Sequence, residues 1–345
     1  MLNSATASWA STLVAEPAAD SQTGALLGLL RALGEARYRF ITTTPLTHRR
    51  LLDRRTGQLA RGPRDVFGWN MPFAHDAVPW SLLSLMEKAG VLLAHDNVLR
   101  SSVRFASVDD DVFVHSSFPT VEDDAVFFGP DTYRFVRFIE QSLPRWKIKS
   151  ADTGFGDARR PLRVLDVGCG SGAGGLVAAK SLAQSGLKTT LTMNDINPRA
   201  LRFTEINADA LGMPIELAPG DALAATMGQF DLIISNPPYM ADVHRRAYRD
   251  GGANMGRDLS VRIATEALTR LAPGGRLLLY TGVAIVEGVN PLVQELAPVL
   301  DASDCDWSII EIDPDVFGEE LDEPPYARAE RIAAVGLTAT KRRVG

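Results

Sequence analysis

A glycine-rich segment near the middle of the chain constrains its fold more than any other feature. Residues 162–167 form an apolar run suited to a buried strand, and residues 174–184 are mostly small and have helical spacing. Gly168, Gly170 and Gly172 lie between these two segments. Because glycine adopts backbone conformations that other residues avoid, a strand can turn sharply into a helix here and present its backbone to a ligand. This unit predicts an open α/β sheet that binds a nucleotide-type ligand at its carboxyl edge.

Apolar runs and helical patterns alternate along the rest of the chain. Further strands are predicted at residues 189–194, 215–218, 230–235 and 276–281, and helices at 198–211 and 259–271. Pro273-Gly274-Gly275 is expected to end the last helix. Two final strand-like runs, 307–312 and 332–340, are separated by an acidic loop and predict an antiparallel hairpin. We therefore expect a doubly wound, mostly parallel, seven-stranded sheet of the Rossmann-like type.

The first 125 residues follow a different pattern. Helices are predicted at residues 24–37 and 79–89, and residues 90–115 alternate as a small sheet would. A helix followed by a short β-ribbon is the order of a winged-helix module. We expect a mixed α/β, winged-helix-like N-terminal domain over residues 1–125 and the larger α/β domain over residues 126–345.

Composition indicates a soluble, globular protein. Of the 345 residues 46% are apolar, yet no run reaches the roughly 18 apolar residues that a membrane span needs. The first thirty residues lack the basic segment and long apolar stretch of a secretion signal, so we expect a cytoplasmic protein with no membrane partner. Cys169 and Cys305 are too few for a disulfide framework or a Cys-based zinc site, and no metal is expected.

Charge leaves two classes of partner open. The net charge of −6 argues against a protein that wraps nucleic acid, because phosphates require a surplus of cations. Nine arginines nevertheless lie between residues 31 and 64 against only Glu35 and Asp53, so 9 − 2 gives this stretch a local charge of +7. This stretch is either a surface that binds RNA or a solvated face compensated by the acidic runs 109–111 and 122–124.

A polar and aromatic motif, Asn236-Pro237-Pro238-Tyr239, directly follows the strand predicted at 230–235. The Asn side chain offers one acceptor and two donors, the prolines fix φ and donate no hydrogen bond, and the Tyr supplies a flat face. We expect the Asn236 side-chain oxygen and the Pro237 carbonyl to accept the two N–H bonds of a planar amino group. Tyr239 would then cover that group and exclude water.

The glycine turn alone does not identify the cofactor. Gly168, Gly170 and Ala173 also fit the dinucleotide pattern, in which a helix N-terminus receives a pyrophosphate. Asp166, two residues before the first glycine, is poorly matched to a pyrophosphate but suits the ammonium of an amino-acid moiety. A planar-amine site also has no use in hydride transfer. We therefore expect S-adenosylmethionine (SAM) rather than NAD.

Two acidic residues at later strand ends extend the predicted cofactor site. Asp195 ends the second strand, where a carboxylate can accept both hydroxyls of a ribose, and Asn197 before Pro198 is the better helix cap. Asp221 follows the third strand and can face the exocyclic amine of adenine or stabilise a turn. The candidate cofactor site comprises Asp166, Gly168, Cys169, Gly170, Gly172, Asp195, Ile196, Asp221, Ala222 and Asn236.

In their order along the chain, these residues resemble the class I SAM-dependent methyltransferases. The resemblance is to the branch with an Asn-Pro-Pro-Tyr motif, and most closely to the HemK-type protein-glutamine N5 methyltransferases. It runs from about Asp131 to the C-terminus and includes Gly256-Arg257-Asp258-Leu259. It implies that SAM is held by Asp166, Gly168, Gly170, Asp195 and Asp221, and the acceptor by Asn236, Pro237 and Tyr239.

The resemblance implies as acceptor the glutamine of a Gly-Gly-Gln motif in a translation release factor. Nucleobase-amine methyltransferases share the tetrapeptide, so an RNA or DNA methyltransferase acting on an exocyclic amine of adenine or guanine is the alternative. The N-terminal part is about twice as long as the helical bundle of typical HemK-type enzymes, and residues 128–133 replace their Pro-rich, Glu-containing linker. Because that part normally docks the partner, residues 1–125 are expected to recognise the substrate.

The loop expected after the motif carries four basic residues: His244, Arg245, Arg246 and Arg249. They are interpreted as a solvated loop, with contact to a phosphate or an acidic protein surface as the alternative. Gly251 and Gly252 are candidate hinges for closure over the acceptor. Tyr133 and Phe135 are interpreted as core aromatics on a helix, with packing over the cofactor as the alternative.

Overall fold

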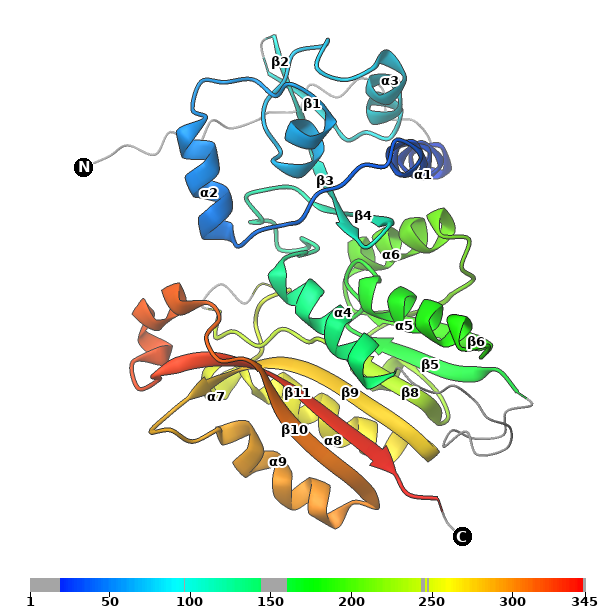
Figure 1. Cartoon of the computed structure of the whole chain (residues 1–345), viewed down its shortest axis with the longest axis vertical. Helices are drawn as coiled ribbons and strands as arrows, with labels where there is room; N and C mark the ends of the chain where they lie inside the picture. Colours follow the sequence, from blue (N-terminus) through cyan, green and yellow to red (C-terminus); the bar gives the residue numbers. More distant parts are fainter. Residues whose placement is uncertain (1–18, 96, 144–159, 243–245, 247, 344–345) are drawn as a thin grey trace. The chain divides into compact units, whose positions relative to one another are not determined.

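The computed structural model describes residues 19–95, 97–143, 160–242, 246 and 248–343, which form two compact units (Figure 1). The N-terminal unit comprises residues up to Val121, together with Phe127–Pro130 and Asp209–Gly212. The C-terminal unit comprises Glu122–Val126, Asp131–Ala208 and Met213–Gly345.

The C-terminal unit is built on a seven-stranded sheet in the order β10-β11-β9-β8-β5-β6-β7. The strands from β5 to β9 pair in parallel, while β11 runs antiparallel to both β9 and β10. The predicted doubly wound sheet with a closing antiparallel hairpin is therefore confirmed. The strands are β5 (Leu162–Val167), β6 (Thr189–Asp195), β7 (Glu216–Pro219), β8 (Phe230–Ser235), β9 (Leu271–Ile285), β10 (Cys305–Asp313) and β11 (Arg331–Lys341).

Helices cover both faces of this sheet (Figure 1). Leu165 and Val167 of β5 point into a core formed with α8 and α9, whereas Asp166, between them, points toward the start of α5. This alternation follows from the two-residue period of a strand. One face carries α4 (Pro130–Ser142), α5 (Ala173–Gln184) and α6 (Pro198–Ala210), and the other carries α8 (Asp258–Arg270) and α9 (Pro291–Ala302).

The expected turn at Pro273-Gly274-Gly275 is instead a bulge within the bounds of β9. Phe230 pairs with Leu271, but Leu232 pairs with Arg276, so the extra residues of β9 protrude between these two pairs. The α8 helix ends before this point, at Arg270. Proline and glycine therefore interrupt the strand pairing here rather than separate a helix from a strand.

The short helix α7 (Ala253–Gly256) and the helix α9 were not predicted from the sequence. The α4 helix contains Tyr133 and Phe135, which were expected on a helix, and it begins within the segment 128–133 that replaces the linker. The α9 helix begins with a capping signal that is present in the sequence, an Asn followed by a Pro. The Asn290 side chain accepts hydrogen bonds from the backbone N–H groups of Leu292 and Val293, and Pro291 occupies the first turn.

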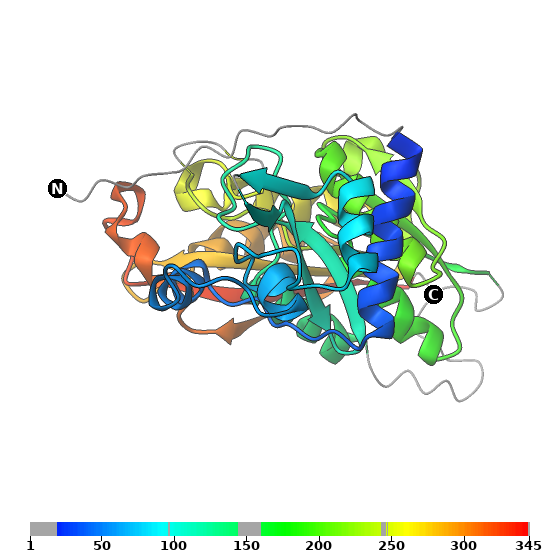
Figure 2. The ribbon, with the colours of Figure 1, turned by 90° about the horizontal axis from the view of Figure 1, so that it is seen from above.

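The N-terminal unit mixes helices with two antiparallel hairpins. The expected order of a helix followed by a β-ribbon is present in α3, β1 and β2, and Figure 2 shows α1 and α3 side by side. The α2 helix was not predicted, although Thr44 caps it and Pro45 opens it. The elements are α1 (Ala19–Glu35), α2 (Pro45–Arg54), the π-helical turn η1 (Arg64–Gly68), α3 (Trp80–Lys88), β1 (Leu92–His95), β2 (Val98–Ser101), β3 (Val103–Val108) and β4 (Asp111–Ser116).

Two histidines are fully buried in the N-terminal unit. His48 Nε2 lies 2.9 Å from the Trp69 carbonyl oxygen, and His48 Nδ1 lies 3.5 Å from the Arg104 guanidinium. This geometry fits a neutral ring that donates through Nε2. Burial, reinforced by Arg104, lowers the pKa of His48 to about 3 and lowers that of His115 well below its ordinary value.

We predict that the N-terminal unit loses stability as the pH falls below 6.5. The unfolded chain then binds protons that the folded unit excludes, so the stability present above pH 6.5 is lost toward pH 3. For His48 the loss is on the order of 2 kcal/mol at pH 5. Thermal unfolding followed by circular dichroism between pH 7.5 and 5 measures it. His48→Phe removes this titration, and an equally steep pH dependence in that variant would exclude His48 as the cause.

Candidate active site

Three adjacent strands end level with one another at the carboxyl edge of the sheet. Val167 at the end of β5 pairs with Asn194 of β6 on one side and with Ser235 of β8 on the other. The Ser235 hydroxyl donates a hydrogen bond of 2.8 Å to the Val167 carbonyl and fastens β8 to β5. This register brings the glycine turn (residues 168–172), Asp195 and Asn236 to one place.

The glycine turn requires its glycines for conformational reasons. Gly168, Gly170 and Gly172 have φ values of 71°, 57° and 81°, in the left-handed region that L side chains avoid. A Cβ atom at Gly168 or Gly170 would meet no other atom within 4 Å, so the backbone faces open space there. A ligand can therefore approach the main chain closely. Cys169 between them is buried, with its sulfur 3.4 Å from the Thr204 hydroxyl.

Asp166 is buried beneath this turn with 1% of its surface exposed. Its carboxylate accepts a 2.7 Å hydrogen bond from the backbone N–H of Gly175 in α5. Burial raises the pKa of Asp166 to about 7, and the nearby Asp195 adds to the rise. A cationic group placed beside this carboxylate would favour its ionised form.

Asp195 is held rigidly at the end of β6. Its carboxylate accepts hydrogen bonds from the backbone N–H groups of Gly170, at 2.9 Å, and Asn197, at 2.8 Å. The Asn197 side chain accepts from the Arg199 N–H, which is the capping contact expected of it. Ile196 is 63% exposed directly beside this carboxylate. An apolar side chain and an acidic side chain therefore lie together at the edge.

Asp221 lies at the end of β7 in a more exposed setting than Asp195. Both its oxygens accept hydrogen bonds from Arg262 of α8, at 3.0 and 2.7 Å, and this contact lowers the pKa of Asp221. Ala222, the next residue, is buried. No local pattern predicts the Arg262 partner, because the pair joins residues 41 positions apart.

Asn236 lies at the end of β8 with a half-buried side chain. That side chain makes no hydrogen bond to any residue within the described ranges. Pro237 is buried behind it, and Pro238 is half-buried. Among the motif residues, Asn236 therefore has polar groups available for a ligand.

Tyr239 differs from its expected orientation because its hydroxyl points into the protein. It donates a 2.7 Å hydrogen bond to a carboxylate oxygen of Asp131 in α4, and the Tyr280 hydroxyl donates to the other oxygen at 2.8 Å. The Tyr239 ring lies against Gly282 of β9, where a Cβ atom would come within 2.3 Å of it. Phe135 of α4 is buried as a core aromatic, as predicted.

Two of the described residues that follow the motif, Arg246 and Arg249, are held by ion pairs rather than solvated. Arg246 pairs with the buried Asp242 at 2.6 Å, and Arg249 pairs with Glu320 at 2.5 Å. The Ala241 N–H donates to the Tyr326 hydroxyl at 2.8 Å. The predicted solvated loop is therefore wrong for both arginines, while His244 and Arg245 lie outside the described residues.

Two glycines pack directly against the backbone of the motif. A Cβ atom at Gly251 would lie 1.8 Å from the Gly256 carbonyl oxygen and 2.7 Å from that of Pro238. A Cβ atom at Gly256 would lie 2.3 Å from the Tyr239 carbonyl oxygen. The structure thus gives Gly251 a close backbone contact that a hinge does not explain. Gly252 has φ of 90°, in the region that favours glycine, and its role as a hinge stays a prediction.

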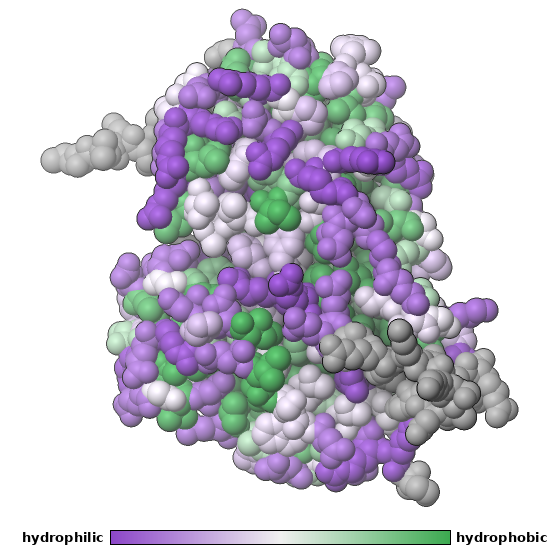
Figure 3. All heavy atoms as spheres, viewed as in Figure 1, coloured by the Kyte–Doolittle hydropathy of each residue, from purple (hydrophilic) through white to green (hydrophobic). Residues whose placement is uncertain are grey.

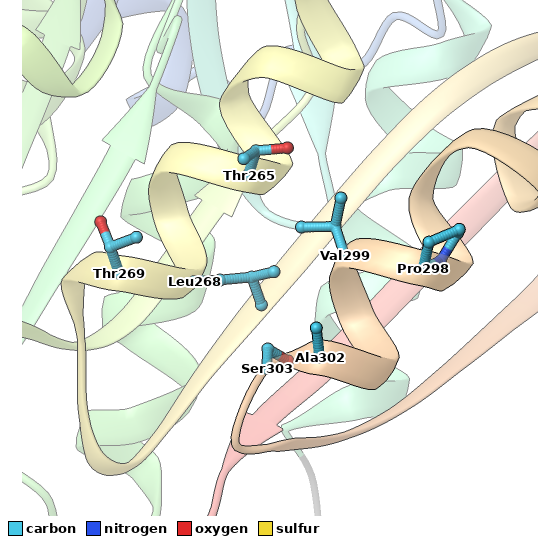
Figure 4. A pocket seen from close by; sticks show the side chains of 7 residues that line it. All are labelled: Thr265, Leu268, Thr269, Pro298, Val299, Ala302 and Ser303. Carbon is cyan, nitrogen blue, oxygen red and sulfur yellow. The ribbon is translucent and has the colours of Figure 1, made fainter.

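A shallow groove between α8 and α9 is separate from this edge (Figure 4). Its side chains come from the second half of α8 and the end of α9, and none of them is ionisable. The groove therefore lacks the groups that chemistry would need. Its lining is Thr265, Leu268, Thr269, Pro298, Val299, Ala302 and Ser303.

Comparison with known proteins agrees with this geometry. Residues 157–284 match the family model described as the methyltransferase small domain. The chain is 33% identical over 168 residues to the release factor glutamine methyltransferase of Koribacter versatilis, covering 45% of this chain and 55% of the relative. It is 34% identical over 181 residues to the release factor glutamine methyltransferase of Deinococcus radiodurans, which covers 49% of this chain and 58% of that relative. The chain thus spans little more than half the length of these relatives.

A shorter similarity is to an enzyme of RNA. The ribosomal RNA small subunit methyltransferase C of Shewanella sp. strain MR-4 is 46% identical over 77 residues, which cover 22% of this chain and 21% of the relative. This match is closer in identity but covers about half as much of the chain as the release factor methyltransferases do.

The C-terminal unit thus has the mostly parallel, seven-stranded fold of the class I methyltransferases, a class whose methyl donor is SAM. The matched segment is similar to release factor glutamine methyltransferases, in agreement with the HemK-type resemblance of the sequence. In the described part of the chain, no His, Cys, Asp and Glu side chains are grouped as a metal site would require. None of the described helices is long and apolar enough to cross a membrane.

We predict that Gly256→Ala displaces the motif. The substitution combines the strain of φ at 84° with a clash against the Tyr239 carbonyl, so it should lower methyl transfer by about tenfold or more and reduce the melting temperature. Gly288→Ala is the matched control, because Gly288 has φ of 71° and no atom within 4 Å of its Cβ position. Equal losses in both variants would assign the effect to backbone strain alone.

Proposed function

We propose that this protein is a SAM-dependent N-methyltransferase whose acceptor is a planar nitrogen, the side-chain amide of a glutamine in a Gly-Gly-Gln motif of a translation release factor. One observation carries the proposal. Asn236 directly follows β8 next to the glycine turn, and its side chain is half-buried without a hydrogen bond to any described residue. The similarity to release factor glutamine methyltransferases supports glutamine as the acceptor.

The residues of the carboxyl edge suit the parts of SAM. The Asp166 carboxylate would hold the ammonium group, since its burial without a cationic partner calls for one. Asp195 would accept the ribose hydroxyls, and Ile196 would pack on the adenine. Asp221 and Ala222 would face the adenine amine. The glycine turn, through Gly168, Cys169, Gly170 and Gly172, would lie along the methionine part, and SAM supplies an electrophilic sulfonium methyl group.

The chemistry asked of the acceptor site is orientation. An amide nitrogen is a poor nucleophile because its lone pair is delocalised into the carbonyl. If the Asn236 side-chain oxygen and the Pro237 carbonyl accept its two N–H bonds, the nitrogen is fixed and positive charge growing on it is favoured. The proton leaves after transfer, so no strong base is needed. Tyr239 would border the planar group while its hydroxyl remains on Asp131.

We propose residues 1–125 as the substrate-recognition domain, with the exposed face of α2 as part of its docking surface. Of the nine arginines between residues 31 and 64, Arg39 and Arg55 pair with carboxylates in the described part of the chain. Figure 3 shows strongly hydrophilic side chains over the region of α2. Arg49, Arg50 and Arg54 are exposed there.

A second candidate function follows from these arginines. An exposed, arginine-rich helix also suits the phosphates of RNA, which keeps a nucleobase-amine methyltransferase as the alternative. Transfer of labelled methyl from SAM separates the two. A release factor with Gly-Gly-Gln and unmodified ribosomal and transfer RNA are offered in parallel, with Asn236→Ala as control. Label on the glutamine supports the proposal, and label on RNA alone overturns it.

We predict that Asn236→Ala lowers kcat by about 10²-fold or more, because one well-placed polar group is removed from the reacting nitrogen. SAM affinity should stay within about twofold, since Asn236 would contact the acceptor and not the bulk of SAM. Asp195→Ala should do the reverse and weaken SAM first. Calorimetric titration measures both affinities, and an equal loss of SAM affinity in Asn236→Ala would remove it from the acceptor site.

We also predict that SAM binding weakens as the pH falls below 7. The Asp166 carboxyl, with a pKa of about 7, must lose its proton to hold an ammonium group, so Kd should rise by up to about tenfold per pH unit toward pH 5. Calorimetry in buffers of different ionisation enthalpy detects the released proton. Asp166→Asn should bind SAM weakly with a flat pH dependence, whereas an unchanged pH dependence would count against this role.

A further inference from the structure

A buried carboxylate joins the acceptor motif to the rest of the C-terminal unit. Asp131, at the start of α4, has 4% of its surface exposed. Its two oxygens accept hydrogen bonds from different tyrosines, Tyr239 of the motif at 2.7 Å and Tyr280 of β9 at 2.8 Å. Arg134, one turn later in α4, contacts the same carboxylate at 3.2 Å.

The hydrogen-bond donors and Arg134 offset the cost of burying the Asp131 carboxylate. Burial raises the pKa of Asp131, while the hydrogen bonds from the two tyrosines and the charge of Arg134 oppose that rise. Arg134 is itself held by Asp313 of β10, at 2.8 Å. Segments from α4, the motif, β9 and β10 thus meet at one charged group. Removing a single donor would leave part of that charge unsatisfied.

The same helix also reaches the glycine turn. Phe135 follows Asp131 by four residues and therefore lies on the same face of α4. Its ring lies so close to Gly174, at the start of α5, that a Cβ atom there would be 2.4 Å from it. One rigid turn of α4 therefore contacts the start of the cofactor-binding helix and, through Asp131, the acceptor motif.

The backbone between Tyr239 and Asn236 is stiff, so the position of Tyr239 limits the position of Asn236. Pro237 and Pro238 separate Tyr239 from Asn236, and each proline fixes its own φ. The residue before a proline is also restricted, which limits Asn236 itself. A fixed Tyr239 therefore restrains the backbone that carries the Asn236 side chain and the Pro237 carbonyl.

We propose that Asp131 is a positioning residue for methyl transfer, which acts through the Tyr239 hydroxyl to set Asn236 and Pro237 against the glycine turn. This inference rests on the proposed acceptor site. It assigns to α4 the task of holding acceptor and cofactor at a fixed separation. A displacement of about 1 Å between reacting groups can cost 10²-fold in rate, so even a modest shift of the motif would be measurable.

The test compares two hydroxyls on one carboxylate. Tyr239→Phe and Tyr280→Phe each remove one hydrogen bond to Asp131, but only Tyr239 belongs to the motif. We expect Asp131→Asn and Tyr239→Phe each to lower kcat by about tenfold or more, and the double variant to be no slower than the slower single variant. Tyr280→Phe should lose comparable thermal stability yet keep kcat within about threefold. SAM affinity should change by less than about twofold in all four.

Hydrogen exchange gives a readout that does not depend on the acceptor. In Asp131→Asn and Tyr239→Phe, the amides of residues 239–242 should exchange faster than in the wild type, whereas Tyr280→Phe should leave them close to wild type. Additive losses in the double variant, or equal losses of kcat in both tyrosine variants, would overturn the positioning role. If the wild type methylates no release factor, the proposed function fails, and the exchange measurement alone decides the inference.

Discussion

The parallel pairing of β5 with both β6 and β8 is the constraint on which the rest of the site depends. Because Val167 is level with Asn194 and Ser235, the glycine turn, Asp195 and Asn236 arrive at one edge from three separate strands. Each then needs only local support. Backbone N–H groups hold Asp195, conformational freedom shapes the glycine turn, and prolines stiffen the motif.

Three buried carboxylates at or near this edge differ in how their charge is compensated. Asp195 is satisfied by backbone N–H groups, and Asp131 by two tyrosines and an arginine. Asp166 accepts one backbone hydrogen bond and has no cationic contact among the described residues, which is why burial raises its pKa to about 7. The hydrogen bonds of the first two come from the protein itself. The third is incomplete by itself, as expected of a group whose counter-charge belongs to a ligand.

Much of the C-terminal fold and its edge could be predicted because the signals are local. The strands, the glycine turn and the motif each lie within a few consecutive residues, and sheet topology does the rest. What escaped prediction depends on distant partners. Asp131 meets Tyr239 and Tyr280 across 108 and 149 residues, and nothing nearby in the sequence distinguishes it from a linker aspartate. The sequence shows that residues 251 and 256 are glycines, but it does not predict which backbone segment each of them contacts. At residues 273–275 the local signal was misleading, since a turn and a bulge use the same residue types.

The ion pairs and tyrosines around the motif also bear on where the methyltransferase domain ends. The segment that matches the family model runs from residue 157 to residue 284 and contains the glycine turn, the motif and most of β9. It omits Asp131 and Phe135 on one side, and Asp313, Glu320 and Tyr326 on the other. A fragment cut to the matched boundaries would keep every residue assigned to cofactor and acceptor and lose those that hold the motif in place. The smallest fragment with an ordered acceptor site therefore has to begin before α4 and continue through β11.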